Sequence, residues 1–151
     1  MAISPNVTFV SGAVLTAAQQ NAFGFGLVQF GTATVTSTGI TTIATQITVA
    51  AFTAIASRNY KITYSEPNLI CTGIDGEATM TIMVGSTTYN TSIVRTSSSL
   101  GLCGSVTAIT TFSAGSTVVL CKLTNFNSTN TAANRSATKY ALCTIEDVGP
   151  A

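Results

Sequence analysis

Polar and apolar residues alternate along most of the chain from about Val28 onward. The clearest case is Tyr60, Ile62 and Tyr64, which alternate with Lys61 and Thr63. Successive side chains of a β-strand point to opposite faces, so this pattern is typical of strands with one buried face. The same pattern recurs in three further segments, at Ala78, Met80, Ile82 and Val84, at Tyr89, Thr91 and Ile93, and at Ala141, Cys143 and Ile145.

Turn-forming residues separate these runs and divide the chain into short strands. We predict turns at residues 66–68, 75–76, 85–86, 100–101 and 114–116, and a polar loop at an exposed edge over residues 125–135. The runs between them predict about eight strands, at 28–36, 41–50, 59–65, 77–84, 87–95, 104–112, 116–124 and 138–147.

This organisation predicts one all-β domain over residues 28–151. Short strands at regular spacing indicate a sandwich or barrel, and eight of them favour a jelly-roll-like antiparallel β-sandwich over the alternative, an immunoglobulin-like sandwich. The length of 151 residues suits a single domain. No internal repeat of the kind found in solenoids or propellers is visible.

Residues 1–27 form a different kind of segment. Thr16 followed by Gln19 matches a capping box, and Asn21 or Gly24 can end the resulting short helix. A helix this short is marginal in water, so it needs an external contact. Leu15, Phe23 and Phe25 can fold back on the domain, or the segment can dock on another subunit. We favour an attachment arm whose candidate partner-binding residues are Phe9, Val14, Leu15, Thr16, Gln19, Phe23 and Phe25.

The composition is apolar and nearly uncharged. Hydrophobic residues make up 46% of the chain and charged residues only 7%, with a formal net charge of +1. Soluble domains commonly carry about 25% charged residues, so subunit contacts are expected to cover much of the surface. Nucleic acid is not an expected partner, because the sequence has no basic cluster.

No membrane partner is expected either. Apolar runs such as residues 43–55 are interrupted by threonine and glutamine, and none approaches the ~18–20 residues that a spanning helix needs. The N-terminus has no basic region before Phe9 and does not resemble a signal peptide. We therefore expect assembly in a cytoplasm.

The sequence argues against an enzyme. Histidine is absent, and no nucleophile elbow, phosphate loop or dinucleotide motif occurs. Asp75 and Glu77 flank a turn glycine and are expected to be solvated, since two carboxylates fall short of calcium's ligand number. Glu146 and Asp147 are adjacent in a strand and point to opposite faces. We expect no catalytic residue, metal or cofactor.

Four cysteines, Cys71, Cys103, Cys121 and Cys143, are too widely spaced for a CxxC motif. Two disulfides are arithmetically possible in three connectivities, and the spacing does not select one. Because no export signal is apparent, we expect all four to be small buried hydrophobic residues in strands.

Several stretches resemble small virion proteins of tailed bacteriophages. The opening "PNVTFVSGAVLTAAQQNAF" resembles the G-x-V-L-T-A-A-x-x-N start of many such proteins. The stretches "SRNYKITYS", "TFSAGSTVVLCKLTNFNS" and "KYALCTIEDVGPA" resemble their β-domains in the same order. The resemblance implies a virion structural protein with a trimeric jelly-roll body and an N-terminal attachment segment. It departs from fibres in lacking a coiled-coil or collagen-like stalk and a separate receptor-binding tip.

A compact body favours a capsid decoration, or cement, protein that docks its arm on major capsid subunits. From chain length such a body is roughly 30–40 Å across, whereas a fibre has to span a distance. A tail fibre or baseplate appendage involved in host attachment is the alternative. A carbohydrate-binding jelly roll is a third class, but Tyr60, Tyr64, Tyr89 and Tyr140 are expected to fill the core or trimer contacts.

Overall fold

The structure is a computed structural model that describes residues 26–71, 76–96, 101–126 and 130–151. Every regular element in these residues is a β-strand. Because the described residues begin at Gly26, the domain boundary placed between residues 27 and 28 stays a prediction. Outside the described residues lie the expected helix and all the candidate contact residues of the arm, Phe9, Val14, Leu15, Thr16, Gln19, Phe23 and Phe25.

The described residues form eight main strands and four short ones. The main strands are β1 (Gly26–Ala33), β3 (Ala44–Thr48), β5 (Arg58–Cys71), β6 (Gly76–Val84), β7 (Thr87–Thr96), β8 (Leu102–Thr111), β10 (Val119–Phe126) and β12 (Ala141–Pro150). The short strands are β2 (Ser37–Ile40), β4 (Phe52–Ala54), β9 (Gly115–Thr117) and β11 (Thr131–Ala133). Each of the eight predicted strands overlaps a main strand, so the all-β prediction and the eight-strand pattern are confirmed.

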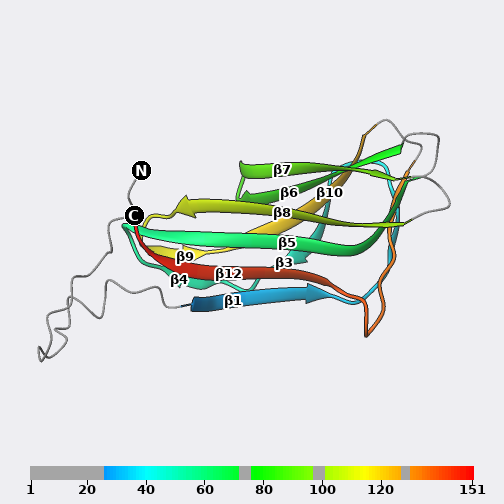
Figure 1. Cartoon of the computed structure of the whole chain (residues 1–151). Helices are drawn as coiled ribbons and strands as arrows, with labels where there is room; N and C mark the ends of the chain where they lie inside the picture. The colour runs from blue at the N-terminus through cyan, green and yellow to red at the C-terminus, as the bar shows by residue number, and fades with distance from the viewer. Residues whose placement is uncertain (1–25, 72–75, 97–100, 127–129) are drawn as a thin grey trace, which may run out of the picture.

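The main strands make two antiparallel layers. Sheet A has the order β1-β12-β5-β8, and sheet B has the order β3-β10-β6-β7. Figure 1 shows sheet A with β1 lowest, followed upward by β12, β5 and β8. Strands distant in the chain, such as β1 and β12, lie side by side, as in a jelly roll of two four-stranded sheets.

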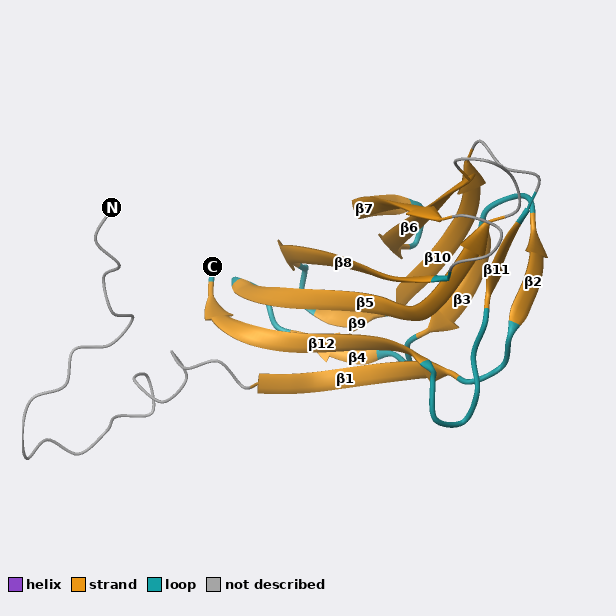
Figure 2. Ribbon diagram, turned by 45° about the vertical axis from the view of Figure 1, so that its right-hand side comes forward, coloured by secondary structure: helices purple, strands orange, loops and turns teal. Residues whose placement is uncertain are grey.

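The short strands extend the two layers at opposite ends. Strands β11 and β2 continue sheet A beside the second half of β5, and Figure 2 shows them at the end of the sandwich away from the C-terminus. Strands β4 and β9 pair at the other end. They continue β3 and β10, because the Val49 N–H donates to the Val119 carbonyl across the junction at 3.0 Å.

The core lies between the sheets and contains the alternate apolar residues predicted for three of the four segments. In the fourth segment Ile93 was predicted on the same buried side as Tyr89 but is 55% exposed, because the register of β6 with β7 shifts between Ile82 and Met83. In β5, Tyr60, Ile62 and Tyr64 are buried at 1% exposure or less. An aromatic cluster of Tyr60, Phe52 and Phe112 fills the end near β4, with ring centroids 5.5 to 6.1 Å apart. The Tyr60 hydroxyl accepts a hydrogen bond from the Ile55 N–H at 2.8 Å, so its polar atom is satisfied within the apolar cluster.

Three local predictions are wrong. The turn expected at residues 114–116 overlaps strand β9, which begins at Gly115. The turn expected at residues 66–68 is part of strand β5, which bends there through an irregular register between Glu66 and Leu69 instead of ending. The loop expected over residues 125–135 contains strand β11, which pairs with both β5 and β2. In all three places pairing with distant strands overrides the local turn preference of the sequence.

Candidate interaction surface

Ion pairing within the fold keeps five of the ten described charged side chains away from solvent. The Arg135 side chain forms a bidentate pair with Glu66, with Nε to Oε2 at 3.0 Å and Nη2 to Oε1 at 2.5 Å. Both side chains are nearly inaccessible, at 2% and 0% exposure. Arg135 also donates to Gln46 Oε1 at 2.8 Å and to the Val35 carbonyl at 3.1 Å. The guanidinium therefore joins β3, β5 and the segment before β2 to the segment that follows β11.

The same carboxylate accepts a hydrogen bond from the Tyr64 hydroxyl. Burial raises the pKa of the Tyr64 phenol well above its usual range, and the adjacent Glu66 carboxylate adds to the effect. The phenol is therefore a hydrogen-bond donor at every ordinary pH and not a proton-transfer group.

A second buried pair lies at the opposite end of β5. Arg58 Nε and Nη2 donate to the two carboxylate oxygens of Asp147 at 2.5 and 2.8 Å, and Asp147 Oδ1 also accepts the Gly149 N–H at 2.9 Å. Glu146 points the opposite way and meets Lys61 at 3.3 Å on the half-exposed surface. The prediction that Glu146 and Asp147 lie on opposite faces of a strand is confirmed.

The expectation that Glu77 is solvated is wrong. Its side chain is only 7% exposed and accepts a hydrogen bond from Arg95 Nε at 2.5 Å, because Glu77 lies inside strand β6 opposite Arg95 of β7. Asp75 lies outside the described residues. Every acidic side chain that the structure describes is therefore paired with a basic one. Among the described residues, no three His, Cys, Asp or Glu side chains come together as potential metal ligands.

The outward side of sheet A forms a regular and almost uncharged surface, which we call the outer face. Alternate residues of β5 point outward, and the strand register aligns them with residues of β1, β12 and β8. Three rows of four side chains result. They are Leu27-Glu146-Lys61-Ile109, Phe30-Thr144-Thr63-Thr107 and Thr32-Leu142-Ser65-Ser105.

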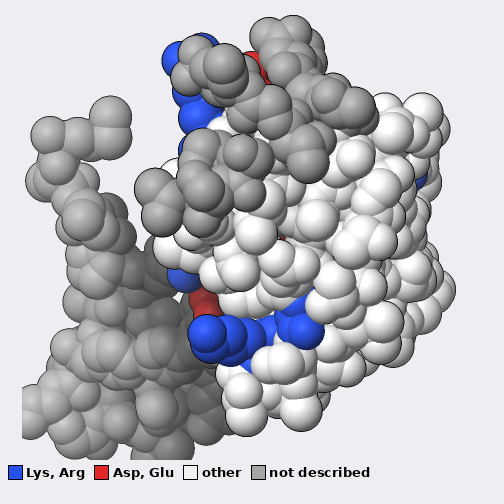
Figure 3. All heavy atoms as spheres, turned by 90° about the vertical axis from the view of Figure 1, so that its right-hand side faces the viewer, with Lys and Arg blue, Asp and Glu red and all other residues white. Residues whose placement is uncertain are grey.

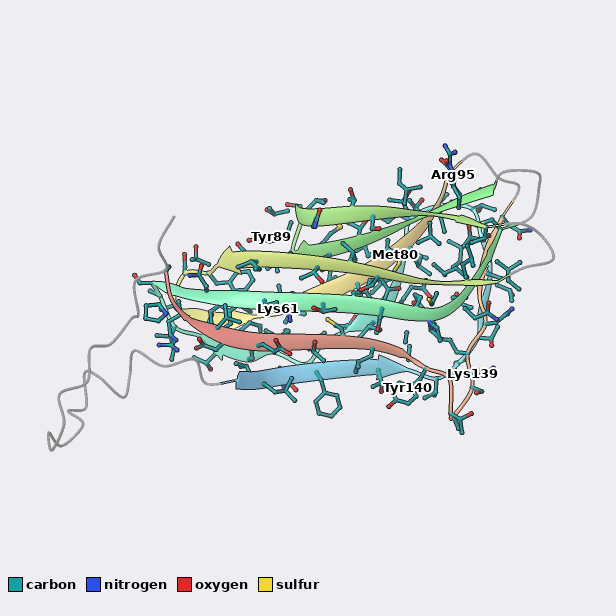
Figure 4. The ribbon with its side chains drawn as sticks, viewed as in Figure 1. Lys61, Met80, Tyr89, Arg95, Lys139 and Tyr140 are labelled. Atoms are coloured by element: carbon teal, nitrogen blue, oxygen red, sulfur yellow. The ribbon has the colours of Figure 1, made fainter. Side chains whose placement is uncertain are left out.

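Large apolar side chains lie exposed along both margins of the outer face. Leu27 and Phe30 on β1 are 59% and 55% exposed, and Ile109 on β8 is 67% exposed. Between them the only charges in the three rows are the mutually paired Lys61 and Glu146. Figure 4 shows Lys61 in the middle of this sheet. This surface has exposed apolar side chains at its margins, with neutral hydroxyl groups and one salt bridge between them. Such a surface is suited to contact with another protein.

The remaining described surface carries the unpaired charges. Lys122 projects from β10 of sheet B and Lys139 precedes β12, and neither makes a salt bridge within the described residues. In the described strands of sheet B, Ile93 is the one large apolar side chain that is more than half exposed, at 55%. On the end of the sandwich in Figure 3, blue atoms form small groups on a mostly white surface.

Strand β1 joins the outer face to the N-terminal segment. In the described structure β1 pairs only with β12, and its sequence GLVQFGTA contains neither a charge nor a proline. Exposed edges are usually protected by such residues or by a covering segment. Here the Gln29 side chain accepts the Phe30 N–H at 3.0 Å and covers one backbone donor. Gly26 begins the strand with a φ of 72°, a conformation that glycine adopts without strain.

The cysteine and tyrosine predictions hold in part. Cys71, Cys121 and Cys143 are buried in strands, whereas Cys103 in β8 is exposed, which corrects the expectation for that residue. Tyr60 and Tyr64 lie in the core and Tyr89 packs on Phe112, but Tyr140 is 44% exposed. In the described residues there is no helix with the length and apolar character of a membrane span.

The outer face was missed by sequence reasoning, although part of its signal was visible. The polar half of the alternation in β5, Lys61, Thr63 and Ser65, marks the outward positions. Which residues of β1, β12 and β8 lie beside them depends on pairing between strands far apart in the chain. Leu27 and its partner Glu146 are 119 positions apart. That pairing has no local signature.

No family model matches the chain, and no curated protein sequence matches it. Among solved structures, murine APRIL is 10% identical, with 82% of this chain and 99% of that chain covered and a TM-score of 0.50. The PRD1 vertex protein P5 is 12% identical, with 80% and 71% covered and a TM-score of 0.40. A Bacillus endospore appendage structure, described as a novel family of disulfide-linked pili, is 18% identical, with 93% and 98% covered and a TM-score of 0.38.

The likeness to murine APRIL concerns the fold alone, because only a tenth of the aligned residues are identical. Together with the strand order of the two sheets, it identifies the described domain as an all-β jelly roll.

Proposed function

We propose that this chain is a structural protein of a tailed-bacteriophage virion. Its specific role is that of a capsid decoration protein, which trimerises through its jelly-roll body and docks residues 1–27 on major capsid subunits. The role is non-enzymatic and uses no cofactor, nucleic acid or membrane. The assignment to a virion is based on the resemblance of the opening motif and the β-domain stretches to small virion proteins of tailed bacteriophages. The outer face supports a role in assembly.

The observation that carries the proposal is the distribution of charge. All four described carboxylates are paired with Arg or Lys, and two of the pairs are almost completely buried. The outer face thus presents Leu27, Phe30 and Ile109 beside neutral hydroxyls. Covering these apolar side chains is favourable at roughly 25 cal/mol per Å² of apolar surface, and no isolated charge has to be desolvated.

The N-terminal segment and the outer face are contiguous in the chain. Residue 25 is followed directly by Gly26 and Leu27, and Leu27 begins one margin of the outer face. An arm that leaves from this margin places its own apolar residues next to an apolar surface. This continuity supports an arrangement in which the capsid-docking arm begins next to the trimer contact on the outer face.

Matched isoleucine substitutions on the two sheets test the assembly role of the outer face. Ile109→Arg should convert the trimer to monomers in light scattering at micromolar concentration, because it places an unpaired charge on the covered surface. Ile93→Arg is the control, since Ile93 is a similarly exposed isoleucine on sheet B. A wild-type protein that is monomeric, or equal loss of trimer in both variants, would contradict this use of the outer face.

Location on the particle tests the decoration role itself. Gold labelling or cryo-electron microscopy of intact virions should place the protein on the head. The full-length variant Leu15→Asp with Phe23→Asp should remain folded and lose at least tenfold in capsid occupancy, whereas Thr138→Asp, in an exposed loop, should not. Labelling on the tail would reject decoration in favour of the tail appendage, and full occupancy of the arm variant would reject docking by residues 1–27.

A further inference from the structure

The two sheets approach closely along the side where β1 and β3 meet. A Cβ atom added to Gly31 of β1 would lie 2.7 Å from Ile47 Cγ2 and 3.4 Å from the Cα atom of Val49. Face-to-face sheets are ordinarily about 10 Å apart, with room for side chains from both. Gly31 therefore marks a place where the backbone of sheet A lies almost directly against residues of β3 in sheet B.

The strand registers place a cysteine beside each member of this contact. Cys143 of β12 is the pairing partner of Gly31 in sheet A, and Cys121 of β10 is the pairing partner of Ile47 in sheet B. Both cysteines point inward and are fully buried. Since Gly31 faces Ile47, their neighbours one strand further in, Cys143 and Cys121, face each other across the core.

The opposite margin of the sandwich supports the same alignment of rows. In sheet A the row of paired residues runs from Cys143 through Tyr64 to Val106. In sheet B the row runs from Cys121 through Ile82 to Asn90. The Asn90 side chain donates to the carbonyl of Thr107, the residue after Val106, at 2.6 Å. The two rows thus face each other at both ends. A hydrogen bond with the Cys143 thiol, together with burial, raises the pKa of the Cys121 thiol.

The other two cysteines have different surroundings. Cys71 lies beside Thr131 of β11, with its sulfur 3.4 Å from the Thr131 hydroxyl. Cys103 is exposed on β8. Cys121 and Cys143 are therefore the pair that the fold brings together.

We propose that Cys121 and Cys143 form a disulfide bond joining sheet B to sheet A when the folding chain meets a low-molecular-weight disulfide such as glutathione disulfide. One thiolate attacks a glutathione sulfur, breaks its S–S bond and releases one glutathione thiolate. The second cysteine then attacks the mixed disulfide and releases the other glutathione. The two cysteines lose two protons and two electrons, and one glutathione disulfide becomes two glutathiones.

Because both sulfurs are buried in the folded protein, the reaction is expected during folding and not afterwards. Thiolate, not thiol, is the reacting species, and a raised pKa keeps the folded Cys121 protonated. Oxidation is therefore fast while the chain folds and slow once the sandwich has closed. The bond closes a loop in the chain between β10 and β12. It stabilises the fold because the closed loop has fewer conformations in the unfolded state. This cross-link is independent of the proposed virion function.

Refolding of the full chain with Cys103→Ser tests the cross-link. This substitution removes the exposed thiol, so trypsin then yields three peptides with one cysteine each: 62–95 with Cys71, 96–122 with Cys121 and 140–151 with Cys143. Refolding with glutathione disulfide should join peptides 96–122 and 140–151. The Tm should rise by about 5–10 °C relative to protein refolded with a non-thiol reductant.

The same chain with Cys143→Ser is the matched variant and should show neither the joined peptides nor an oxidation-dependent rise in Tm. If that variant does not fold, the peptide map of the Cys103→Ser chain decides alone. The inference is overturned if peptides 96–122 and 140–151 stay separate with free thiols after oxidative refolding. It is equally overturned if peptide 140–151 is joined to peptide 62–95 instead.

Discussion

Replacement of Arg135 by methionine should lower the free energy of unfolding by about 3–5 kcal/mol, because the change leaves the Glu66 carboxylate buried without its cation. Glu66 is fully inaccessible and receives two hydrogen bonds from Arg135. The substitution also removes donors to Gln46 and to the Val35 carbonyl. Denaturant unfolding at neutral pH, with fluorescence or circular dichroism as the signal, measures the loss.

Two variants separate a buried charge from a general effect of removing a cation. Lys61→Met breaks the half-exposed pair with Glu146 and should cost no more than about 0.5 kcal/mol, as surface pairs usually do. The double variant Arg135→Met with Glu66→Gln should recover part of the stability lost by Arg135→Met, because no carboxylate is then left unpaired. Equal losses in Arg135→Met and Lys61→Met would show that the Glu66 pair is not structurally important.

Alkaline pH should lower the free energy of unfolding of the reduced protein by about 5 kcal/mol between pH 8 and pH 11. The folded state holds the pKa values of both Tyr64 and Cys121 well above their usual ranges, mainly through burial for Tyr64 and through the Cys143 thiol and burial for Cys121. In the unfolded chain a cysteine ionises near pH 8.5 and a tyrosine near pH 10. Stability is therefore fully present below pH 8.5 and falls as the unfolded chain releases protons that the folded chain keeps.

Denaturant unfolding at a series of pH values, in the presence of a reductant, measures this effect. Cys121→Ala should remove the larger share of the pH dependence, because the unfolded Cys121 ionises over the whole interval above pH 8.5. Cys103→Ala removes an exposed thiol and should leave the pH dependence unchanged. A free energy of unfolding that stays constant from pH 8 to pH 11 would contradict the assigned role of the two buried groups.

The fold class was predictable because strand alternation is a local property of the sequence. Tyr60, Ile62 and Tyr64 are buried in the structure as their spacing predicts, and the eight predicted strands overlap the eight main strands. The strand ends were less predictable. Residues 66–68 have strong turn preferences, yet β5 continues through them to Cys71, because β8 and β11 supply pairing partners that a local pattern does not reveal.

Local sequence patterns do not reveal which charged residues pair with each other in the fold. Residues 125–135 were predicted to form a polar loop at an exposed edge, and Arg135 is the last residue of that stretch. In the fold it meets Glu66, which is 69 positions earlier in the chain. Glu77 was expected in solvent and is buried beside Arg95 for the same reason, namely that an antiparallel register sets its neighbours.

The sequence by itself determined that this protein is an antiparallel β-sandwich with few charges, and it determined which side of β5, β6 and β12 is apolar. Side-chain direction in a strand depends only on the parity of the residue position, so it can be read one segment at a time. The tertiary structure alone decided that Leu27, Phe30 and Ile109 share one face, that Arg135 neutralises Glu66, and that Cys121 faces Cys143. Each of these depends on the order and register of strands far apart in the chain, which are set by the packing of the whole core and not by any one segment.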